Sequence, residues 1–495
     1  MRRTSQGKTG KVFATLAALA LVVAACGDDD DDDAEDTTAT TAAATETTTA
    51  PATTEAVTEE TSAPATDAPE TTEASAPETT AASEVAPEDI ATDVGVDDTT
   101  IKVGMLADLS GAFAPLVTQI VAAQEVFWDK VNADGGIAGR QVELVVEDNG
   151  YDVAVMQEKF EALRDEVAII SQSTGSPHTA SIAAGLVEED LIAIPLSWYS
   201  GWAFGETGQN ALESYTNYCL ESMNGVEYLS SEMGIETVAI ISFPGEYGGD
   251  GAAGAAKAAE ALGLEVVFDG TGLVTPPSAD NPSPDQTAII SQIVQTNPDL
   301  VWAVINPSQL GVIMGGAVAQ GYTGQWSGNS PTYNYQALQS DLGPLLDQYY
   351  TASTYIVTWG SDVPGMQEVV DAMTEARPDL PVSDVYIVGW TEGMITKAVL
   401  EQAAANGDMT RAGIVAAASE VTVDFNGLAP TQTWGGEPNE FVVRESYIYD
   451  IDLSAFNYVT LGEGGGTTGS TLLTGPYTGE LAADYDFSEP CFVAG

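Results

Sequence analysis

Short hydrophobic runs alternate with longer amphipathic segments along most of the chain. Apolar runs at 101–107, 142–146, 167–170 and 191–194 are separated by segments whose apolar residues recur at helical spacing. The short runs are typical of strands buried on both faces, and the longer segments are typical of helices that bury one face. This alternation predicts an α/β protein whose parallel sheets are built from strand–helix–strand units.

The helices expected in this first series lie at 113–132 and 153–164, with a further one between the last two strands. A second series follows, with strands expected at 237–243, 264–268, 300–305 and near Gln325, and helices at 248–262, 287–296 and 309–320. A third block contains a long helix at 384–406 and strand-like runs at 349–358, 421–425 and 441–449. Two series followed by a return of the chain predict two Rossmann-like lobes with parallel sheets, joined by a hinge of several segments.

These patterns divide the folded part of the chain between the two lobes. We expect one lobe to comprise 94–225 and 355–420 and the other 226–354 and 421–455, with 456–495 as a Gly/Thr-rich C-terminal extension. Open α/β sheets bind ligands at the carboxyl ends of their strands. The expected site is therefore the cleft between the lobes, closed by hinge motion.

The first 25 residues have the features of a secretory signal peptide. Basic residues precede an apolar run at 12–25, which is shorter than the about 20 residues needed to span a bilayer. The run ends in VAACG at 23–27, which resembles a bacterial lipobox, so we expect Cys26 to be lipidated. An ordinary signal peptide with an incidental cysteine is the alternative. The expected location is extracytoplasmic, with the lipid as the anchor to the bacterial cell membrane.

Residues 26–93 have a composition that favours disorder. An acidic run at 28–33 is followed by a segment of Thr, Ala, Glu, Pro and Ser without aromatic residues up to about residue 87. Such a segment buries too little apolar surface to offset the entropy of ordering. We expect a disordered acidic stalk.

Charge excludes one class of partner. The chain has 14 Lys and Arg residues against 74 Asp and Glu residues, for a formal net charge of −60. The few cations outside the signal peptide are scattered, so no basic patch is available to displace counterions from phosphates. We therefore expect no nucleic-acid partner.

Residues suited to catalysis are sparse. His178 is the sole histidine, no His/Cys cluster is spaced for zinc, and no phosphate-binding loop with its lysine is present. We expect no enzyme activity, no metal and no cofactor. Cys219 and Cys491 remain after Cys26, and in an oxidising compartment we expect them to form a disulfide.

Four motifs occur in the order found in one known family. IKVG (101–104), LSG (109–111), VNADGGIAGR (131–140) and EYGGDG (246–251) are similar to motifs of the periplasmic leucine/isoleucine/valine-binding proteins. The resemblance implies the type I periplasmic binding protein fold and a monomer that captures a small molecule. It also implies delivery of that molecule to the permease subunits of an ABC transporter. Two alternatives are a ligand-sensing receptor lobe for a membrane signalling partner and a structural surface lipoprotein.

The resemblance also implies ligand-binding residues in the first lobe. Ser176 and Thr179 match positions that contact the ligand carboxylate, and Ser197, Trp198 and Tyr199 lie in a second carboxylate-binding stretch. Free backbone N–H groups and hydroxyls at a helix start hold a carboxylate without a basic residue. Helix capping is the alternative role for the first pair, and lobe packing is the alternative for the two aromatic residues.

In the second lobe, the resemblance assigns Tyr247 and Asn306 to the cleft. Ser330 stands where amino-acid binders have an acidic residue that pairs with the ammonium group. An ammonium buried without a counter-charge is destabilised, which argues against a zwitterionic amino acid unless Glu246 or Asp108 substitutes. Aromatic residues are abundant at the expected loop ends. The ligand classes considered are therefore an amino acid, an amide and a small carboxylate or aromatic compound, with a flat, apolar or amide-like ligand as our hypothesis.

Overall fold

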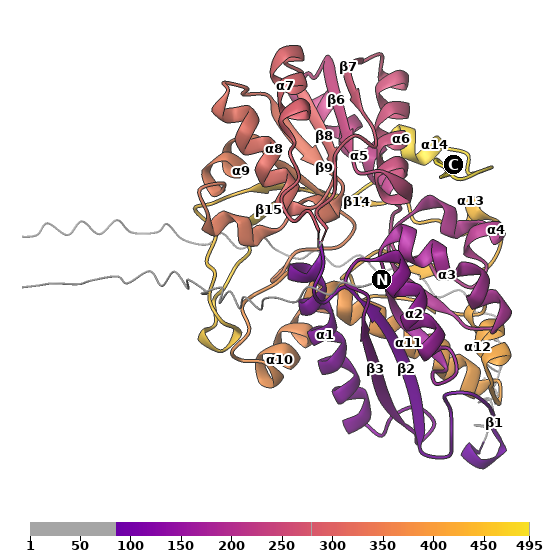
Figure 1. Cartoon of the computed structure of the whole chain (residues 1–495). Helices are drawn as coiled ribbons and strands as arrows, with labels where there is room; N and C mark the ends of the chain where they lie inside the picture. Colours follow the sequence, from indigo (N-terminus) through magenta and orange to yellow (C-terminus); the bar gives the residue numbers. More distant parts are fainter. Residues whose placement is uncertain (1–85, 279, 495) are drawn as a thin grey trace, which may run out of the picture. The chain divides into compact units, whose positions relative to one another are not determined.

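The computed structural model describes residues 86–278 and 280–494 (Figure 1). The predicted signal peptide, the lipidation site Cys26 and most of the predicted stalk lie outside these residues. Two four-stranded parallel sheets, each covered by helices, form the two lobes. The predicted fold class is confirmed.

The first lobe is built on a sheet of strand order β3-β2-β4-β5. Its strands are β2 (Thr100–Ala107), β3 (Gln141–Asp148), β4 (Ile169–Thr174) and β5 (Ala193–Leu196). Its first helices are α1 (Ala114–Ala133), α2 (Val153–Leu163) and α3 (Ser176–Glu188), followed by the short α4 (Gly205–Gly208). β4 and β5 are buried along their whole length, as expected for parallel strands between helical layers.

The second lobe repeats this plan with the order β7-β6-β8-β9. Its strands are β6 (Thr237–Ser242), β7 (Glu265–Gly270), β8 (Leu300–Val304) and β9 (Gln325–Gly328). Its helices are α5 (Tyr218–Met233), α6 (Gly245–Leu262), α7 (Thr287–Thr296), α8 (Pro307–Ala319) and α9 (Gly343–Tyr349). α5 spans the expected lobe boundary at residue 225 and packs against α6 and β14.

The glycines of α6 allow it to approach its neighbours closely. A Cβ at Gly254 would overlap the backbone carbonyl of Cys219 in α5, and a Cβ at Gly251 would lie 2.8 Å from Val304 of β8. The helix begins at Gly245, earlier than the predicted residue 248, so Tyr247 lies in its first turn. The glycine-rich stretch is thus a helix that packs tightly.

The last part of the chain returns to both lobes. Its helices are α10 (Met366–Ala376), α11 (Tyr386–Ala405), α12 (Arg411–Ala418), α13 (Pro438–Phe441) and α14 (Glu480–Asp484). α11 packs against α1 and β4 of the first lobe. Short pairs join β1 (Ala91–Thr92) to β11 (Asp408–Met409) and β12 (Thr422–Val423) to β13 (Gln432–Thr433).

The C-terminal extension is part of the second lobe. β10 (Thr351–Thr354), β14 (Ser446–Ile451) and β15 (Ser470–Tyr477) form an antiparallel sheet of order β10-β14-β15. α14 packs against α5, where the carboxylate of Glu227 accepts hydrogen bonds from the backbone N–H groups of Glu480 and Leu481. The C-terminal extension therefore contains an edge strand, β15, and a short helix, α14.

Candidate functional site

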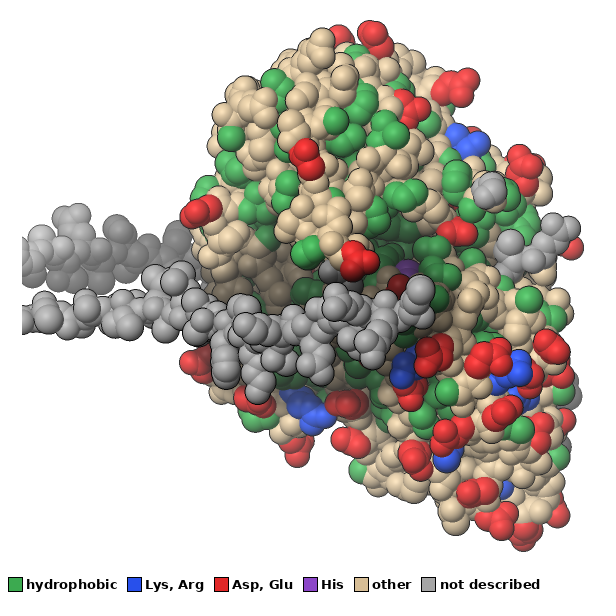
Figure 2. Space-filling model, in the orientation of Figure 1, with side chains coloured by type: hydrophobic (Ala, Val, Ile, Leu, Met, Phe, Trp, Pro, Cys, Tyr) green, Lys and Arg blue, Asp and Glu red, His purple; other side chains and the backbone are tan. Residues whose placement is uncertain are grey.

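A cleft lies between the two lobes, and Figure 2 shows the surface hollowed there. Its empty volume is about 1010 Å³, including open solvent at its mouth. Among the hydrogen bonds that join the lobes, Asn306 Nδ2 donates to the carbonyl of Ala112 at 3.2 Å, and the Tyr335 hydroxyl donates to Gln119 Oε1 at 3.0 Å. The lobes are therefore in contact across the cleft.

The wall of the cleft is mainly apolar and aromatic. The first lobe and α11 contribute Phe113, Leu116, Val117, Ile120, Tyr151, Ser176, Leu196, Trp198, Asp384, Val385 and Val388. The second lobe and the segment after β10 contribute Tyr218, Tyr247, Ser330, Tyr333, Tyr335, Thr354, Tyr355, Ile356, Val357, Tyr449 and Ser470. Asp384 is the single charged side chain among the described residues of this wall.

One end of the cleft carries a cluster of hydroxyl groups at the start of α3. Gly175, with φ of 99°, redirects the backbone between β4 and α3 and brings Ser176 to the cleft. The Ser176 and Ser197 hydroxyls are 2.6 Å apart, and Trp202 Nε1 donates to Ser197 Oγ at 3.1 Å. The Tyr218 hydroxyl interacts with both serines, and burial raises the pKa of Tyr218 well above its usual value. This end offers neutral hydrogen-bond donors and the first N–H groups of a helix, which together suit an anionic oxygen.

Four of the eight ligand-binding residues expected from the sequence line the cleft: Ser176, Trp198, Tyr247 and Ser330. The Trp198 ring lies 4.1 Å from the Tyr355 ring, between centroids. The Tyr247 hydroxyl donates to the carbonyl of Ile305 at 2.8 Å. This bond holds the Tyr247 ring against the Tyr218 ring, with 4.7 Å between the two centroids. These contacts fix an aromatic wall.

The other four residues have structural contacts near the cleft. The Ser197 hydroxyl bonds to that of Ser176, and the hydroxyls of Thr179 in α3 and Ser173 in β4 lie 2.7 Å apart. Asn306 caps α8 by accepting the N–H of Gln309 at 3.0 Å. The Tyr199 hydroxyl donates to the carbonyl of Phe492 at 2.7 Å, on the C-terminal tail.

A buried carboxyl group, Glu221 of α5, lies directly behind Ser330. Its Oε1 accepts the backbone N–H of Ser330 and its Oε2 accepts Asn329 Nδ2, both at 2.8 Å. Burial raises the pKa of Glu221 to about 8. Sequence reasoning missed this residue and named Glu246 and Asp108, neither of which lines the cleft. The Asp108 carboxylate instead accepts backbone N–H groups of its own loop, at Gly111 and Phe113.

His178 lies next to the cleft and does not line it. Its ring packs against Tyr151 at 4.2 Å between centroids, and neither ring nitrogen has a hydrogen-bond partner in the part of the chain that the structure describes. Burial lowers the pKa of His178. The neutral imidazole supports the Tyr151 ring.

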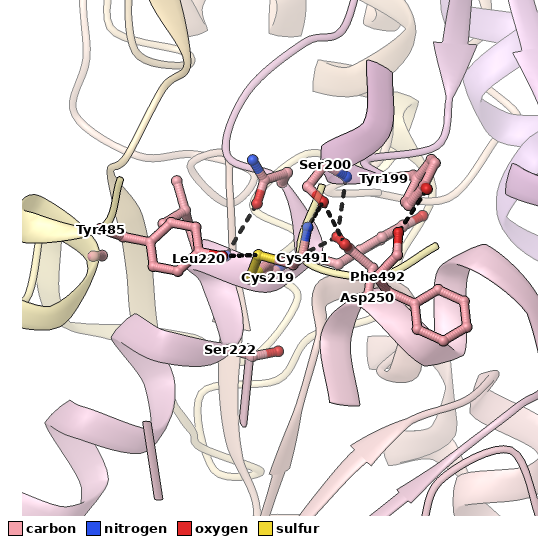
Figure 3. The surroundings of a disulfide bond; sticks show 12 residues. Tyr199, Ser200, Cys219, Leu220, Ser222, Asp250, Tyr485, Cys491 and Phe492 are labelled. Atoms are coloured by element: carbon pink, nitrogen blue, oxygen red, sulfur yellow. Dashed lines mark hydrogen bonds between the residues drawn. A yellow bond between two sulfur atoms is a disulfide. The ribbon is translucent and has the colours of Figure 1, made fainter. Parts of the chain in front are cut away.

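Cys219 of α5 and Cys491 form a disulfide, with their Cα atoms 6.3 Å apart (Figure 3). The Cys491 N–H donates to Ser200 Oγ at 2.9 Å, and Cys219 N donates to the carboxylate of Asp250 in α6 at 3.2 Å. The tail is thereby attached to both α5 and the segment that follows β5.

The comparison with protein families identifies the chain. A family model described as periplasmic binding protein matches residues 100–457, which include both parallel sheets and the whole cleft wall except Ser470. The chain belongs to the periplasmic binding protein family. A comparison with curated proteins finds no match.

Several solved structures resemble this periplasmic binding protein. A fatty acid ABC transporter substrate-binding protein from Thermomonospora curvata is 27% identical, with a TM-score of 0.72, and the match covers 81% of this chain and 97% of that chain. A branched-chain amino acid ABC transporter protein from Thermus thermophilus with bound valine is 18% identical, with a TM-score of 0.64 and coverage of 79% and 98%. A possible leucine/isoleucine/valine-binding protein from Rhodopirellula baltica is 21% identical, with a TM-score of 0.62 and coverage of 75% and 99%. The last two matches show that this chain shares their fold.

Among residues 86–278 and 280–494, no group of three or more His, Cys, Asp or Glu side chains is placed to hold a metal ion. No helix in that part of the periplasmic binding protein is long and apolar enough to cross a bilayer.

Proposed function

We propose that this protein is the solute-binding component of an ABC transporter and that its ligand is a carboxylate with a long apolar chain, such as a fatty acid. The observation that carries the proposal is the face that α1 presents to the cleft. Phe113, Leu116, Val117 and Ile120 line it in sequence, and seven residues of helix correspond to about 10 Å. An elongated apolar wall of this kind favours an acyl chain, because each buried CH2 contributes about 0.8 kcal/mol.

The hydroxyl cluster at the start of α3 is the proposed site for the carboxylate. Ser176, Ser197 and Tyr218 supply neutral donors, and the helix start adds free N–H groups. A cation is not required at such a site, which is consistent with a cleft wall whose described residues include no Lys or Arg. The structural resemblance to the Thermomonospora curvata protein supports the same ligand class.

An amino-acid ligand is less well supported. Ser330 replaces the expected acidic residue, and Glu221 behind it does not line the cleft. Burial raises the pKa of Glu221 to about 8, so this carboxyl group is mostly protonated at neutral pH. A desolvated ammonium beside Ser330 would therefore have no free counter-charge there.

The proposal includes the cellular context. A signal peptide over 1–25, lipidation of Cys26 and a stalk would hold the binding lobes outside the cytoplasmic membrane, where a monomer would deliver its ligand to permease subunits. These parts of the proposal rest on the sequence and on the family, and no enzymatic role is proposed.

Isothermal titration of the full chain tests the ligand class. Saturated fatty acids of increasing length are compared with leucine, valine and aromatic amides. Affinity is expected to rise with chain length until the apolar wall is filled, by up to about 0.8 kcal/mol for each added CH2. Saturable binding of leucine or valine without any binding of fatty acids would overturn the proposed ligand class.

A further inference from the structure

Asp384 lines the cleft among side chains other than those of the hydroxyl cluster. Near the start of α1, the Phe113 ring packs against the rings of Tyr151 and Tyr247, with centroid distances of 4.9 Å and 6.3 Å. All three residues line the cleft together with Ser176. Ser176 adjoins Ser197 and Tyr218. Asp384 instead adjoins Trp359, Thr468 and Tyr333. Asp384 and Val385 precede α11, and both line the cleft together with Val388.

One oxygen of this carboxylate is held by the protein and the other is free. Oδ1 accepts the backbone N–H of Trp359 at 2.7 Å and the hydroxyl of Thr468 at 2.8 Å. Within residues 86–278 and 280–494, no donor bonds to Oδ2 and no Lys or Arg pairs with Asp384. The two bonds fix the orientation of the carboxylate, which leaves a preformed acceptor in the cleft.

The surroundings of Asp384 offer no internal cation. The titratable groups near it are the phenols of Tyr333, Tyr335 and Tyr449, and burial raises the pKa of each. Burial also raises the pKa of Asp384 to about 6, so the group is mostly ionised at neutral pH. A half-buried anion beside an apolar wall is poorly solvated and gains from a donor that arrives with a ligand.

We propose that Asp384 forms a second polar subsite, which binds a hydrogen-bond donor, hydroxyl or ammonium, carried on the distal part of the ligand chain. This inference rests on the proposed function, because it takes the ligand carboxylate to lie at the hydroxyl cluster near Ser176. The ligand class then narrows to acyl carboxylates with a hydroxyl or amino substituent far from the carboxylate.

A purely structural role is the competing explanation, since Asp384 also holds Trp359 and Thr468. The variant Asp384→Asn separates the two roles, because an amide oxygen still accepts those two bonds while the charge is removed. Asp269→Asn is the matched control: Asp269 is an exposed residue of β7 in the second lobe, and its carboxylate likewise accepts a backbone N–H, from Thr271.

The experiment is isothermal titration of the full chain with saturated fatty acids and with their hydroxy- and amino-substituted counterparts of equal length. The wild type is expected to prefer a substituted probe by about tenfold, which corresponds to ~1.4 kcal/mol. Asp384→Asn is expected to lose the preference for the amino probe at an unchanged melting temperature, and Asp269→Asn to keep it. If only the hydroxy probe is preferred, the ligand group that Asp384 binds is a neutral donor. If only the amino probe is preferred, that group is a cation.

Two outcomes would contradict the subsite. One is equal affinity of the wild type for substituted and unsubstituted probes, and the other is an unchanged preference for the amino probe in Asp384→Asn. In both cases, binding of unsubstituted fatty acids would leave the proposed function intact. Failure of every acyl carboxylate to bind would instead reject the proposed function, and the subsite with it.

Discussion

The Ser200 hydroxyl donates a 2.5 Å hydrogen bond to Asp250 Oδ1, which joins the segment after β5 of the first lobe to α6 of the second (Figure 3). Asp250 Oδ2 accepts the N–H groups of Ser200 and Cys219, and the Cys491 N–H donates to the same Ser200 hydroxyl. A single buried carboxyl group thus connects the first lobe, α5, α6 and the C-terminal tail at one crossing of the chain between the lobes.

Replacing this carboxyl group should destabilise the protein. In Asp250→Asn, the amide nitrogen cannot accept hydrogen bonds, so either the two N–H donors or the Ser200 hydroxyl loses its acceptor. An unsatisfied buried donor costs about 1–3 kcal/mol, and we expect a loss of unfolding free energy in that range in chemical denaturation. The exposed substitution Asp269→Asn should change it by less than about 0.5 kcal/mol. Equal stability of the two variants would contradict the role of Asp250.

Buried carboxyl groups predict that the protein is more stable in acid than at neutral pH. Burial raises the pKa of Glu213 to about 8, that of Glu221 to about 8 and that of Asp250 to about 7. Between pH 4 and these values the folded state binds more protons than the unfolded state, so the free energy of unfolding should fall as pH rises. Melting temperatures measured from pH 4 to pH 8 check this, and a rise over that range would contradict it.

Glu213 allows the pH effect to be assigned. Neither of its carboxyl oxygens has a hydrogen-bond partner among the described residues, and its side chain is buried. Glu213→Gln removes this titrating group. The slope of the unfolding free energy against pH, measured by chemical denaturation, should then become less negative by up to about 1.4 kcal/mol per pH unit. Glu265→Gln, at an exposed position of β7, should leave the slope unchanged.

The disulfide should contribute measurably to stability. It joins positions separated by 272 residues, so it restricts the unfolded chain strongly. In the double variant Cys219→Ser and Cys491→Ser, we expect the free energy of unfolding to fall by about 2–4 kcal/mol in guanidinium chloride. Reducing the wild type should produce the same loss and should leave the double variant unaffected. An unchanged midpoint after complete reduction would contradict this role.

Most of the fold could be predicted from the sequence because strand runs and helical periodicity are local signals. The runs near 101–107 and 237–243 became β2 and β6, the strands near the middle of each sheet. The C-terminal extension was harder to predict, since β15 is defined by its pairing with β14 rather than by its own hydrophobicity.

The site was only partly predictable for a similar reason. Ser176 and Trp198 follow predicted strands, so their position near the cleft could be inferred. Glu221 and Asp384 come from α5 and from the start of α11, and nothing in their local sequence shows that these helices approach the cleft. The one sequence feature that sets Glu221 apart is its place as an acidic residue within a largely apolar helical segment. This feature is a weak signal of burial, because acidic residues are more often exposed.

Close packing of α5 against α6 predicts an unusual sensitivity to one methyl group. In Gly254→Ala the new Cβ would overlap the Cys219 carbonyl, which belongs to backbone and cannot move aside easily. We expect a loss of about 1–3 kcal/mol in the free energy of unfolding, as for other overpacked cores. Gly315→Ala in α8 is the control, because a Cβ at that position would point into open space. That variant should be neutral or gain up to about 1 kcal/mol, since alanine favours helix over glycine. A neutral Gly254→Ala would show that the two helices are not in close contact.

The two faces of α1 give the sharpest test of where the ligand lies. Val117 lines the cleft and is buried, whereas Thr118 is exposed on the same helix. Val117→Thr keeps the side-chain shape and places a hydroxyl against the proposed acyl chain, and burial of an unbonded hydroxyl costs about 1–3 kcal/mol. Affinity for a saturated fatty acid should therefore fall by about 5- to 150-fold in isothermal titration. Thr118→Val makes the reverse change outside the cleft and should leave affinity unchanged. Melting temperatures of both ligand-free variants separate binding from folding. Equal affinities in two folded variants would mean that the acyl chain does not follow α1, and the proposed ligand class would lose its main support.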